Sequence, residues 1–187
     1  MAELDPRRPH DYFDRTMAKL PILIAPDPRL KTKAKPVAAV DDRVRQLTDD
    51  MLETMYAAPG IGLAAPQIGV LERIIVIDVA GKEEPPAPLR LINPEITWAS
   101  EDLQTAEEGC LSLPEQWAEV VRPAEVKVRY LDETGAQQET HAAGILATCV
   151  QHEIDHLNGV LFVDHISALR RNMILRKVQK WKKEHAS

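Results

Sequence analysis

Hydrophobic residues recur at helical spacing in the first third of the chain, over residues 43–57. Asp41 and Asp42 stand just before this segment, where a carboxylate can cap the first turn of a helix. Pro59 and Gly60 follow the segment and would end the helix. The pattern therefore predicts an N-terminal helix whose apolar face carries Val44, Leu47, Met51, Leu52 and Met55.

Three segments in the middle of the chain have the pattern of strands. Residues 73–79, RIIVIDV, form a short β-branched run, and a second strand is expected over residues 89–98. The proline-rich stretch GKEEPPAP between them predicts a loop. Apolar residues also alternate over residues 125–131, just before a turn at 132–135.

The pattern returns to helical spacing over residues 142–157, and Gly159 is placed to stop that helix. A last helix is expected over residues 167–183. Central strands with helices at both ends, and no regular strand–helix alternation, indicate an α+β fold. We expect antiparallel or mixed sheets around a central helix, one face of which carries Ile145, Cys149, His152 and His156.

Length and composition fit one compact domain, with 187 residues of which 44% are hydrophobic and 28% charged. A net charge of −6 argues against a protein that coats nucleic acid, so no contact with DNA is expected. No apolar run approaches the roughly 18 residues of a membrane span, and residues 1–20 do not resemble a signal peptide. Two cysteines, Cys110 and Cys149, build no disulfide framework, which favours the cytoplasm.

The two ends of the chain differ from the middle. Residues 1–16 are polar and lack periodicity, so we expect a flexible extension, followed by the main folded domain over 17–169. The remaining residues, 170–187, carry a charge of +6, while the rest of the chain carries −12. A basic helix of this kind suits docking to the phosphates of an RNA, although many such helices are only solvated surfaces.

The strongest chemical signal is the HExxH sequence formed by His152, Glu153 and His156. A separation of four residues turns both imidazoles to one side of a helix, where they can share a metal ion. Glu153 lies beside them and is free to take a proton from a metal-bound water. This motif predicts a metal-dependent hydrolase.

A hydrolytic metal site needs a third protein ligand. The metzincin pattern would place a histidine at position 162, where Phe162 stands, and this excludes that class. Downstream, Asp164 and Glu184 are poorly placed to act as ligands. The upstream candidates are His141, Cys110 and Cys149.

The two cysteines differ in their suitability as the third ligand. Cys149 shares a helical face with His152, so we favour it as a pocket-wall thiol rather than a ligand. Cys110 lies in a separate segment, EGCLSLP, from which a thiolate can reach the histidines. Without the histidines, a small buried apolar position would be the favoured interpretation of Cys110.

Three segments together resemble the signature motifs of the peptide deformylase family of bacterial type. They are GIGLAAPQIG at 60–69, EGCLSLP at 108–114 and QHEIDHLNG at 151–159, in the family's order and spacing. The similarity extends from Leu20 to Ser167. It implies a hydrolase that removes the N-formyl group from N-formylmethionyl peptides of new proteins in the bacterial cytoplasm. It also implies one divalent metal ion, usually Fe2+ with Zn2+, Ni2+ or Co2+ as substitutes, held by Cys110, His152 and His156.

The resemblance also assigns roles around the metal. Water on the metal would attack the formyl carbon, and Glu153 would accept the water's proton and pass it to the departing amine. The side chain of Gln67 and the backbone N–H of Leu111 would stabilise the oxyanion.

We expect the methionine pocket to be walled by Ile61, Ile145, Cys149 and the ring of His152. Gly60 and Gly62 would let the peptide approach the backbone and pair with it as an added strand. Side chains that would orient the ligand imidazoles are Glu108, Arg122 and Asp155.

One departure from the family and two rival functions bear on this prediction. Trp117 stands where some bacterial members carry a basic residue near the substrate path. Family members also use a C-terminal helix to bind the ribosome, which suggests the same for residues 170–187. The rivals are an HExxH zinc endopeptidase and a non-catalytic, metal-stabilised module that binds the ribosome.

Overall fold

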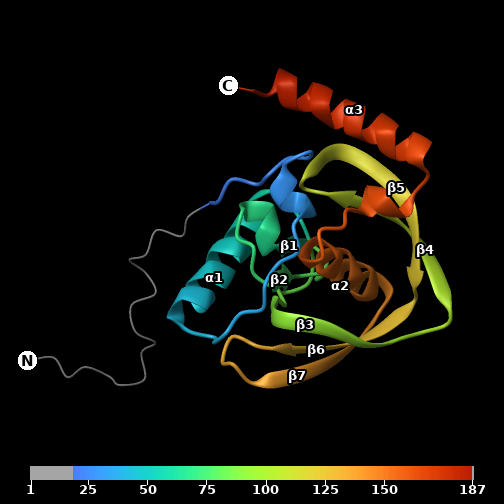
Figure 1. The fold of residues 1–187 in the computed structure, drawn as a ribbon. Helices are drawn as coiled ribbons and strands as arrows, with labels where there is room; N and C mark the ends of the chain where they lie inside the picture. Colours follow the sequence, from blue (N-terminus) through green and yellow to red (C-terminus); the bar gives the residue numbers. More distant parts are fainter. Residues whose placement is uncertain (1–18, 187) are drawn as a thin grey trace, which may run out of the picture.

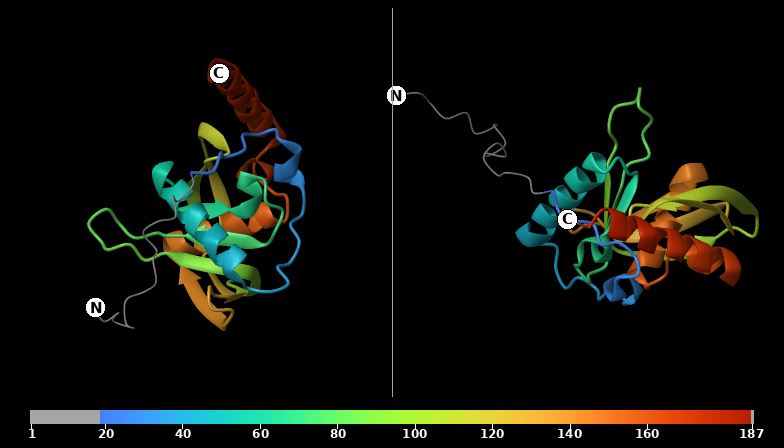
Figure 2. Two further views of the ribbon diagram at one scale, coloured as in Figure 1. Left: turned by 90° about the vertical axis from the view of Figure 1, so that its left-hand side faces the viewer. Right: turned by 90° about the horizontal axis from the view of Figure 1, so that it is seen from above.

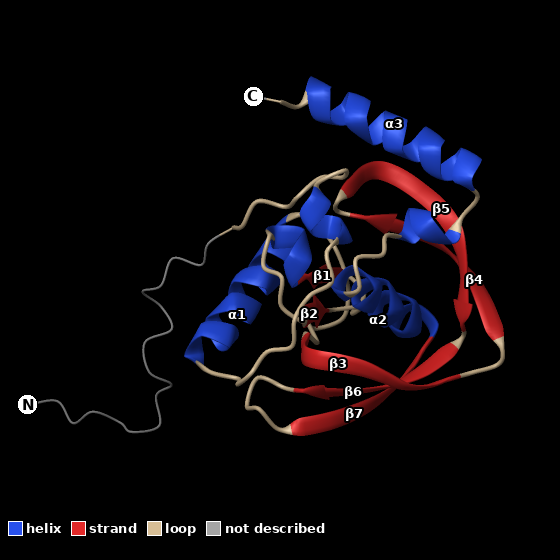
Figure 3. Ribbon diagram, in the orientation of Figure 1, coloured by secondary structure: helices blue, strands red, loops and turns tan. Residues whose placement is uncertain are grey.

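The computed structural model describes residues 19–186, so the extension predicted over residues 1–16 lies outside the described part. The fold is α+β, as the sequence predicts, with helices and antiparallel strands arranged around one central helix (Figures 1 and 3). The helices are α1 (Asp42–Ala57), α2 (Gly144–Leu157) and α3 (Ala168–Glu184). The strands are β1 (Gly62–Ala64), β2 (Ile74–Ile77), β3 (Leu89–Ala99), β4 (Leu103–Cys110), β5 (Leu113–Pro123), β6 (Glu125–Leu131) and β7 (Gln137–Ala143).

The strands form two sheets. The larger has five strands in the order β1-β2-β3-β6-β7, and the smaller is the pair β4-β5. All named neighbours pair antiparallel. Figure 1 shows α2 enclosed by both sheets, and β1 lies at an edge of the larger one.

Strand β2 explains why RIIVIDV is continuously apolar. Ile74 and Val76 pack with α1, while Ile75 and Ile77 pack with α2. Both faces of this strand are therefore buried, and period-two alternation disappears. The strand separates two apolar layers and fixes α1 and α2 on opposite sides of the sheet.

Helix α1 confirms the first predicted helix. The Asp41 side chain accepts a hydrogen bond of 3.0 Å from the Val44 N–H and caps the first turn. Met51, Leu52 and Met55 are buried against the sheet.

Helix α2 begins at Gly144, two residues later than expected. Ala142 and Ala143 pair with Val126 and Glu125 and so belong to β7. Gly144, with φ of 59°, makes the change from strand to helix. The predicted stop is confirmed, because α2 ends at Leu157 and Gly159 follows with φ of 72°.

The hairpin β4-β5 was not expected from the sequence. Its alternation is masked because polar side chains occupy inward positions, among them Glu108 and Arg122, which are buried together. These charges compensate one another, so a strand can bury them.

Helix α3 lies across β5 (Figures 1 and 2). Ser167 caps its first turn, and its inner face buries Ile174 and Val178. Leu169 and Met173 are exposed on the outer side. No helix within residues 19–186 has the length and apolar character needed to cross a membrane.

Candidate active site

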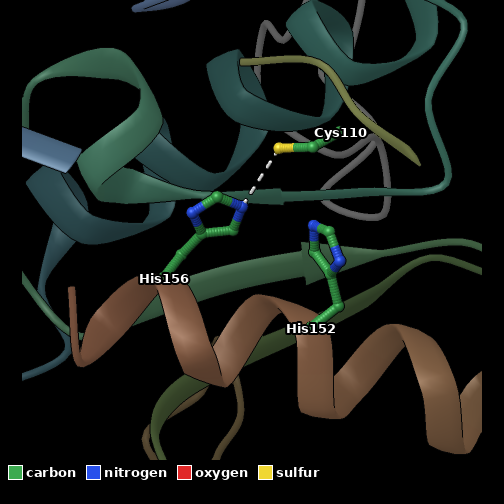
Figure 4. Close-up of side chains that lie close together, drawn as sticks. All are labelled: Cys110, His152 and His156. Carbon is green, nitrogen blue, oxygen red and sulfur yellow. Dashed lines mark hydrogen bonds between the residues drawn. The ribbon is translucent and has the colours of Figure 1, made fainter. Parts of the chain in front are cut away.

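Cys110, His152 and His156 come together although they lie on different elements. Cys110 is the last residue of β4, and both histidines project from one side of α2 (Figure 4). One potential ligand atom from each residue lies within 4.8 Å of the other two. The Cys110 Sγ and His156 Nε2 atoms are 3.3 Å apart.

A thiolate with two imidazoles is a donor set that suits a divalent transition metal ion. Burial lowers the pKa of His156 well below its usual value, so this ring is neutral, the form that binds metals. Its Nδ1 atom is buried without a hydrogen-bond partner in residues 19–186. Cys110, His152 and His156 are also the one cluster of this kind in the described part of the chain. These residues fit a metal ion.

Glu108 fixes the orientation of His152. The His152 Nδ1 and Glu108 Oε2 atoms are 2.9 Å apart, and both side chains are buried. Burial alone would raise the pKa of Glu108, but hydrogen bonds from His152 and Arg122 lower it to about 2. The carboxylate is therefore ionised and accepts a hydrogen bond from the Nδ1–H group of His152, which leaves Nε2 for a metal ion.

Arg122 and Asp155 act one step further out. Arg122 donates to both oxygens of Glu108, at 2.6 and 3.0 Å, and to Asp155 at 2.8 Å. Asp155 also lies 2.7 Å from the Nε2 atom of His165. A line of hydrogen-bonded side chains thus runs from His165 near the surface to His152 in the interior, and Glu108 is the member of this line that contacts His152. No sequence pattern singles out His165.

Glu153 lies beside the cluster and is 4% exposed. Burial raises the pKa of its carboxyl to about 7. Its Oε2 atom has no hydrogen-bond partner within the described residues. Near neutral pH this group can either accept or hold a proton, as a general acid–base residue must.

Gln67 is buried and connects three segments. Its Oε1 atom accepts from the Ala64 N–H at 2.9 Å. Its Nε2 atom donates to the Ser112 Oγ at 3.1 Å and lies 3.5 Å from the Cys110 Sγ. The amide is therefore fixed next to the sulfur atom.

A cavity of about 940 Å³ opens over these groups. Cys149 in its wall is buried, and burial raises the pKa of its thiol well above the usual value, so it stays protonated. Ile61 and Ile145 line the cavity and are 44% and 59% exposed. All the predicted pocket residues line it, together with the other named site residues Gln67, Glu108, Cys110, Leu111 and Glu153.

The cavity has further wall residues that the sequence did not indicate. Ile22 and Ile24 contribute from the N-terminal segment, and Trp181 contributes from α3. Gln104 and Thr148, which are joined by a hydrogen bond of 2.9 Å, also line it. No local pattern signals these residues, because only the tertiary fold brings them to the cavity.

Comparison with known proteins agrees with this geometry. The family model described as polypeptide deformylase matches residues 19–172. A peptide deformylase of Methylocella silvestris is 61% identical over 86% of this chain and 83% of its own length.

Solved structures are similar as well. A peptide deformylase of Ehrlichia chaffeensis superposes with a TM-score of 0.86, at 40% identity over 89% of this chain and 98% of its own. A Met-Ala-Ser-bound class I type b peptide deformylase of Acinetobacter baumannii gives a TM-score of 0.76, at 38% identity over 80% and 99% of the two chains. The sequence motifs, the fold and these matches agree, and the chain belongs to the polypeptide deformylase family.

Proposed function

We propose that this protein hydrolyses the N-formyl group from N-formylmethionyl peptides of nascent proteins, releasing formate and a free amine. The observation that carries this proposal is the cluster of Cys110, His152 and His156, because Cys110 and His152 line one large cavity together with Glu153. Family membership supports the same activity.

In this mechanism Cys110, His152 and His156 hold one divalent metal ion. When bound, the ion supplies a Lewis acid that lowers the pKa of a water molecule and polarises a carbonyl oxygen. Glu153 takes the proton from the attacking water and delivers it to the departing amine. Its pKa of about 7 suits both transfers.

We assign stabilisation of the oxyanion of the tetrahedral intermediate to the Gln67 amide and the Leu111 N–H. Hydrogen bonds at both ends of the Gln67 side chain support this role, because a fixed donor needs no reorganisation during the reaction. Glu108, Arg122 and Asp155 act as positioning residues that keep His152 in its orientation.

The peptide is assigned to the cavity and the edge of β1. An extended chain can add to an edge strand by backbone hydrogen bonds, and Gly60 and Gly62 leave room for its approach. The methionine side chain is assigned to the pocket of Ile61, Ile145, Cys149 and His152. The peptide in the Acinetobacter structure also begins with methionine, which supports this assignment.

Fe2+ is the metal ion we propose for the native enzyme, with Zn2+, Ni2+ and Co2+ as working substitutes. A shell of one thiolate and two imidazoles accepts all of these ions, so the donor set alone supports a divalent transition metal ion.

The deciding experiment is a formate-release assay with formyl-Met-Ala on anaerobically purified protein, combined with elemental analysis. Formate without cleavage of the Met-Ala bond is the expected result. Cleavage of an internal bond in an unformylated peptide would instead indicate an endopeptidase. A metal-containing protein without either activity would indicate a non-catalytic module. Family membership favours neither alternative.

We also propose that the protein works in the bacterial cytoplasm and that basic residues 170–187 bind the ribosome. Lys177 and Lys180 lie on the exposed side of α3, while Ile174 and Val178 hold its inner side to the body. In this proposal residues 17–169 form the catalytic domain, and α3 is a docking helix attached to it.

Charge reversal tests ribosome binding better than deletion, because deletion of α3 would uncover the core around Ile174. Replacing Arg176, Lys177 and Lys180 by Glu should abolish cosedimentation with ribosomes at low salt. Replacing Met173 by Ala is the control. Unchanged cosedimentation of the charge-reversed protein would reject the docking role.

A further inference from the structure

Trp181 belongs to the wall of the active-site cavity although it lies near the end of the chain. It comes from the last turns of α3, whereas Cys110, His152 and Glu153 come from β4 and α2. The figures agree that the C-terminal end of α3 passes over the segment that follows residue 19 (Figure 2). Ile24 of that segment packs in one apolar cluster with Ile174 and Val178.

The inner face of α3 explains how Trp181 reaches the cavity. Ile174, Val178 and Trp181 follow one another at helical spacing, and the first two are buried in the body. Trp181 is half-buried one turn further along the same face. The helix therefore extends its apolar stripe beyond the core and presents an indole ring to the cavity.

His185 holds that ring in place. The Trp181 and His185 rings stack at 4.1 Å with an interplanar angle of 13°. The His185 backbone N–H donates to the Trp181 carbonyl at 3.0 Å, and the His185 Nδ1 atom lies 2.8 Å from the same oxygen. An indole held this way loses little freedom when a ligand packs against it.

The cavity is much larger than one methionine side chain, at about 940 Å³. The predicted methionine pocket uses Ile61, Ile145 and Cys149, and Trp181 lies on a different element from all of these. A second indole, Trp117 of β5, lines the same cavity and is 62% exposed. Two aromatic rings in the wall favour contact with apolar side chains of the peptide.

We infer that Trp181 is a specificity-determining residue, which contacts the substrate peptide beyond the methionine and favours an apolar or aromatic side chain at the third position. This inference rests on the proposed deformylase function. An extended peptide advances about 3.3 Å per residue, so a third residue projects well past the reacting end. The ring would stabilise ground state and transition state alike, and its loss should raise KM without lowering kcat.

The test compares formyl-Met-Ala, formyl-Met-Ala-Ser and formyl-Met-Ala-Phe as substrates of the metal-loaded enzyme. The wild type should prefer the phenylalanine peptide over the serine peptide. Trp181→Ala should lower kcat/KM for the phenylalanine peptide by about 5- to 10-fold, through KM, and change the formyl-Met-Ala value less than about twofold. Trp181→Phe should restore most of the preference, and His185→Ala should reduce it by a smaller factor.

Met173→Ala, on the exposed side of the same helix, is the control and should leave all three values unchanged. Thermal denaturation shows whether each variant is folded. If Trp181→Ala does not fold, the peptide preference of Trp181→Phe is compared with that of the wild type instead. An equal loss for all three peptides, or an unaltered preference in a folded Trp181→Ala protein, would overturn the inference. If the wild type releases no formate from any peptide, the proposed function itself fails.

Discussion

Gly62 on β1 and Glu153 on α2 are in such close contact that no side chain fits between them. A Cβ atom added to Gly62 would stand 2.5 Å from the Glu153 Oε1 atom and 2.8 Å from the Cys149 Sγ atom. The carboxylate assigned to proton transfer is therefore positioned by the absence of a methyl group on the neighbouring strand.

Gly62→Ala should displace Glu153 and lower kcat/KM by about 100-fold, because a misplacement of about 1 Å has an effect of this size. The metal content should stay the same. Gly81→Ala is the control, since its new Cβ would meet other atoms only at ordinary contact distance, 3.6 Å or more. Full activity of Gly62→Ala would show that Glu153 tolerates displacement.

Glu153→Gln should retain the metal ion and lose activity by about 10²- to 10⁴-fold, because an amide cannot accept the proton of the attacking water. Steady-state kinetics and elemental analysis of the same preparation check both parts. Glu119→Gln, at an exposed position of β5, should behave as the wild type. Turnover at the wild-type rate would remove Glu153 from its proposed role.

Cys110→Ser should weaken metal binding by about tenfold or more, because a hydroxyl replaces the thiolate of the ligand set. Equilibrium dialysis against a competing chelator measures the affinity. Cys149→Ser is the matched variant, and its metal affinity should remain at the wild-type level because its sulfur lies outside the cluster. The assignment of Cys110 as a ligand fails if Cys149→Ser loses metal affinity and Cys110→Ser keeps it.

Protonation of Glu108 should lower the free energy of unfolding in acid. Its pKa is lowered from 4.5 to about 2 in the folded protein, so the folded state favours the ionised form. The resulting stabilisation is complete above about pH 5 and is lost as the pH falls towards 2, which amounts to about 3 kcal/mol.

Urea denaturation of the metal-free protein at pH 7, 5 and 3 measures this loss. Glu108→Gln should be less stable at pH 7, because Arg122 remains buried with a weaker partner. Its stability should then change less between pH 5 and 3 than that of the wild type. Parallel curves for the two proteins would show that other carboxyl groups dominate the acid response.

Local pattern was sufficient for the elements that bury apolar faces. The spacing of Val44, Met51 and Met55 predicted α1, and the run from Ile74 to Ile77 predicted β2. His152 and His156 were predicted to share a helical face, and the structure brings both to Cys110. Helical geometry alone connects the two histidines, so their relationship follows directly from the sequence.

Features that depend on distant partners were beyond such reasoning. The hairpin β4-β5 could not be predicted because Glu108 and Arg122 have the sequence character of surface residues. Only the structure shows that they are buried together as an ion pair. The contribution of Trp181 to the cavity depends on the path of α3 across β5. The starting point of α2 depended on Ala142 and Ala143, whose pairing with β6 outweighs their helical preference.

The hairpin that carries Cys110 is not part of the five-stranded sheet. Its position against α2 depends on side chains, chiefly the contacts of Glu108 and Arg122 with His152 and Asp155. Backbone ladders hold each sheet internally, whereas the hairpin meets α2 through side chains, including the hydrogen bonds of Gln104 with Thr148 and of Gln151 with the Pro123 carbonyl. Gentle heating should therefore separate the hairpin from the helix before either one melts, and catalytic competence should disappear while circular dichroism still reports a folded chain.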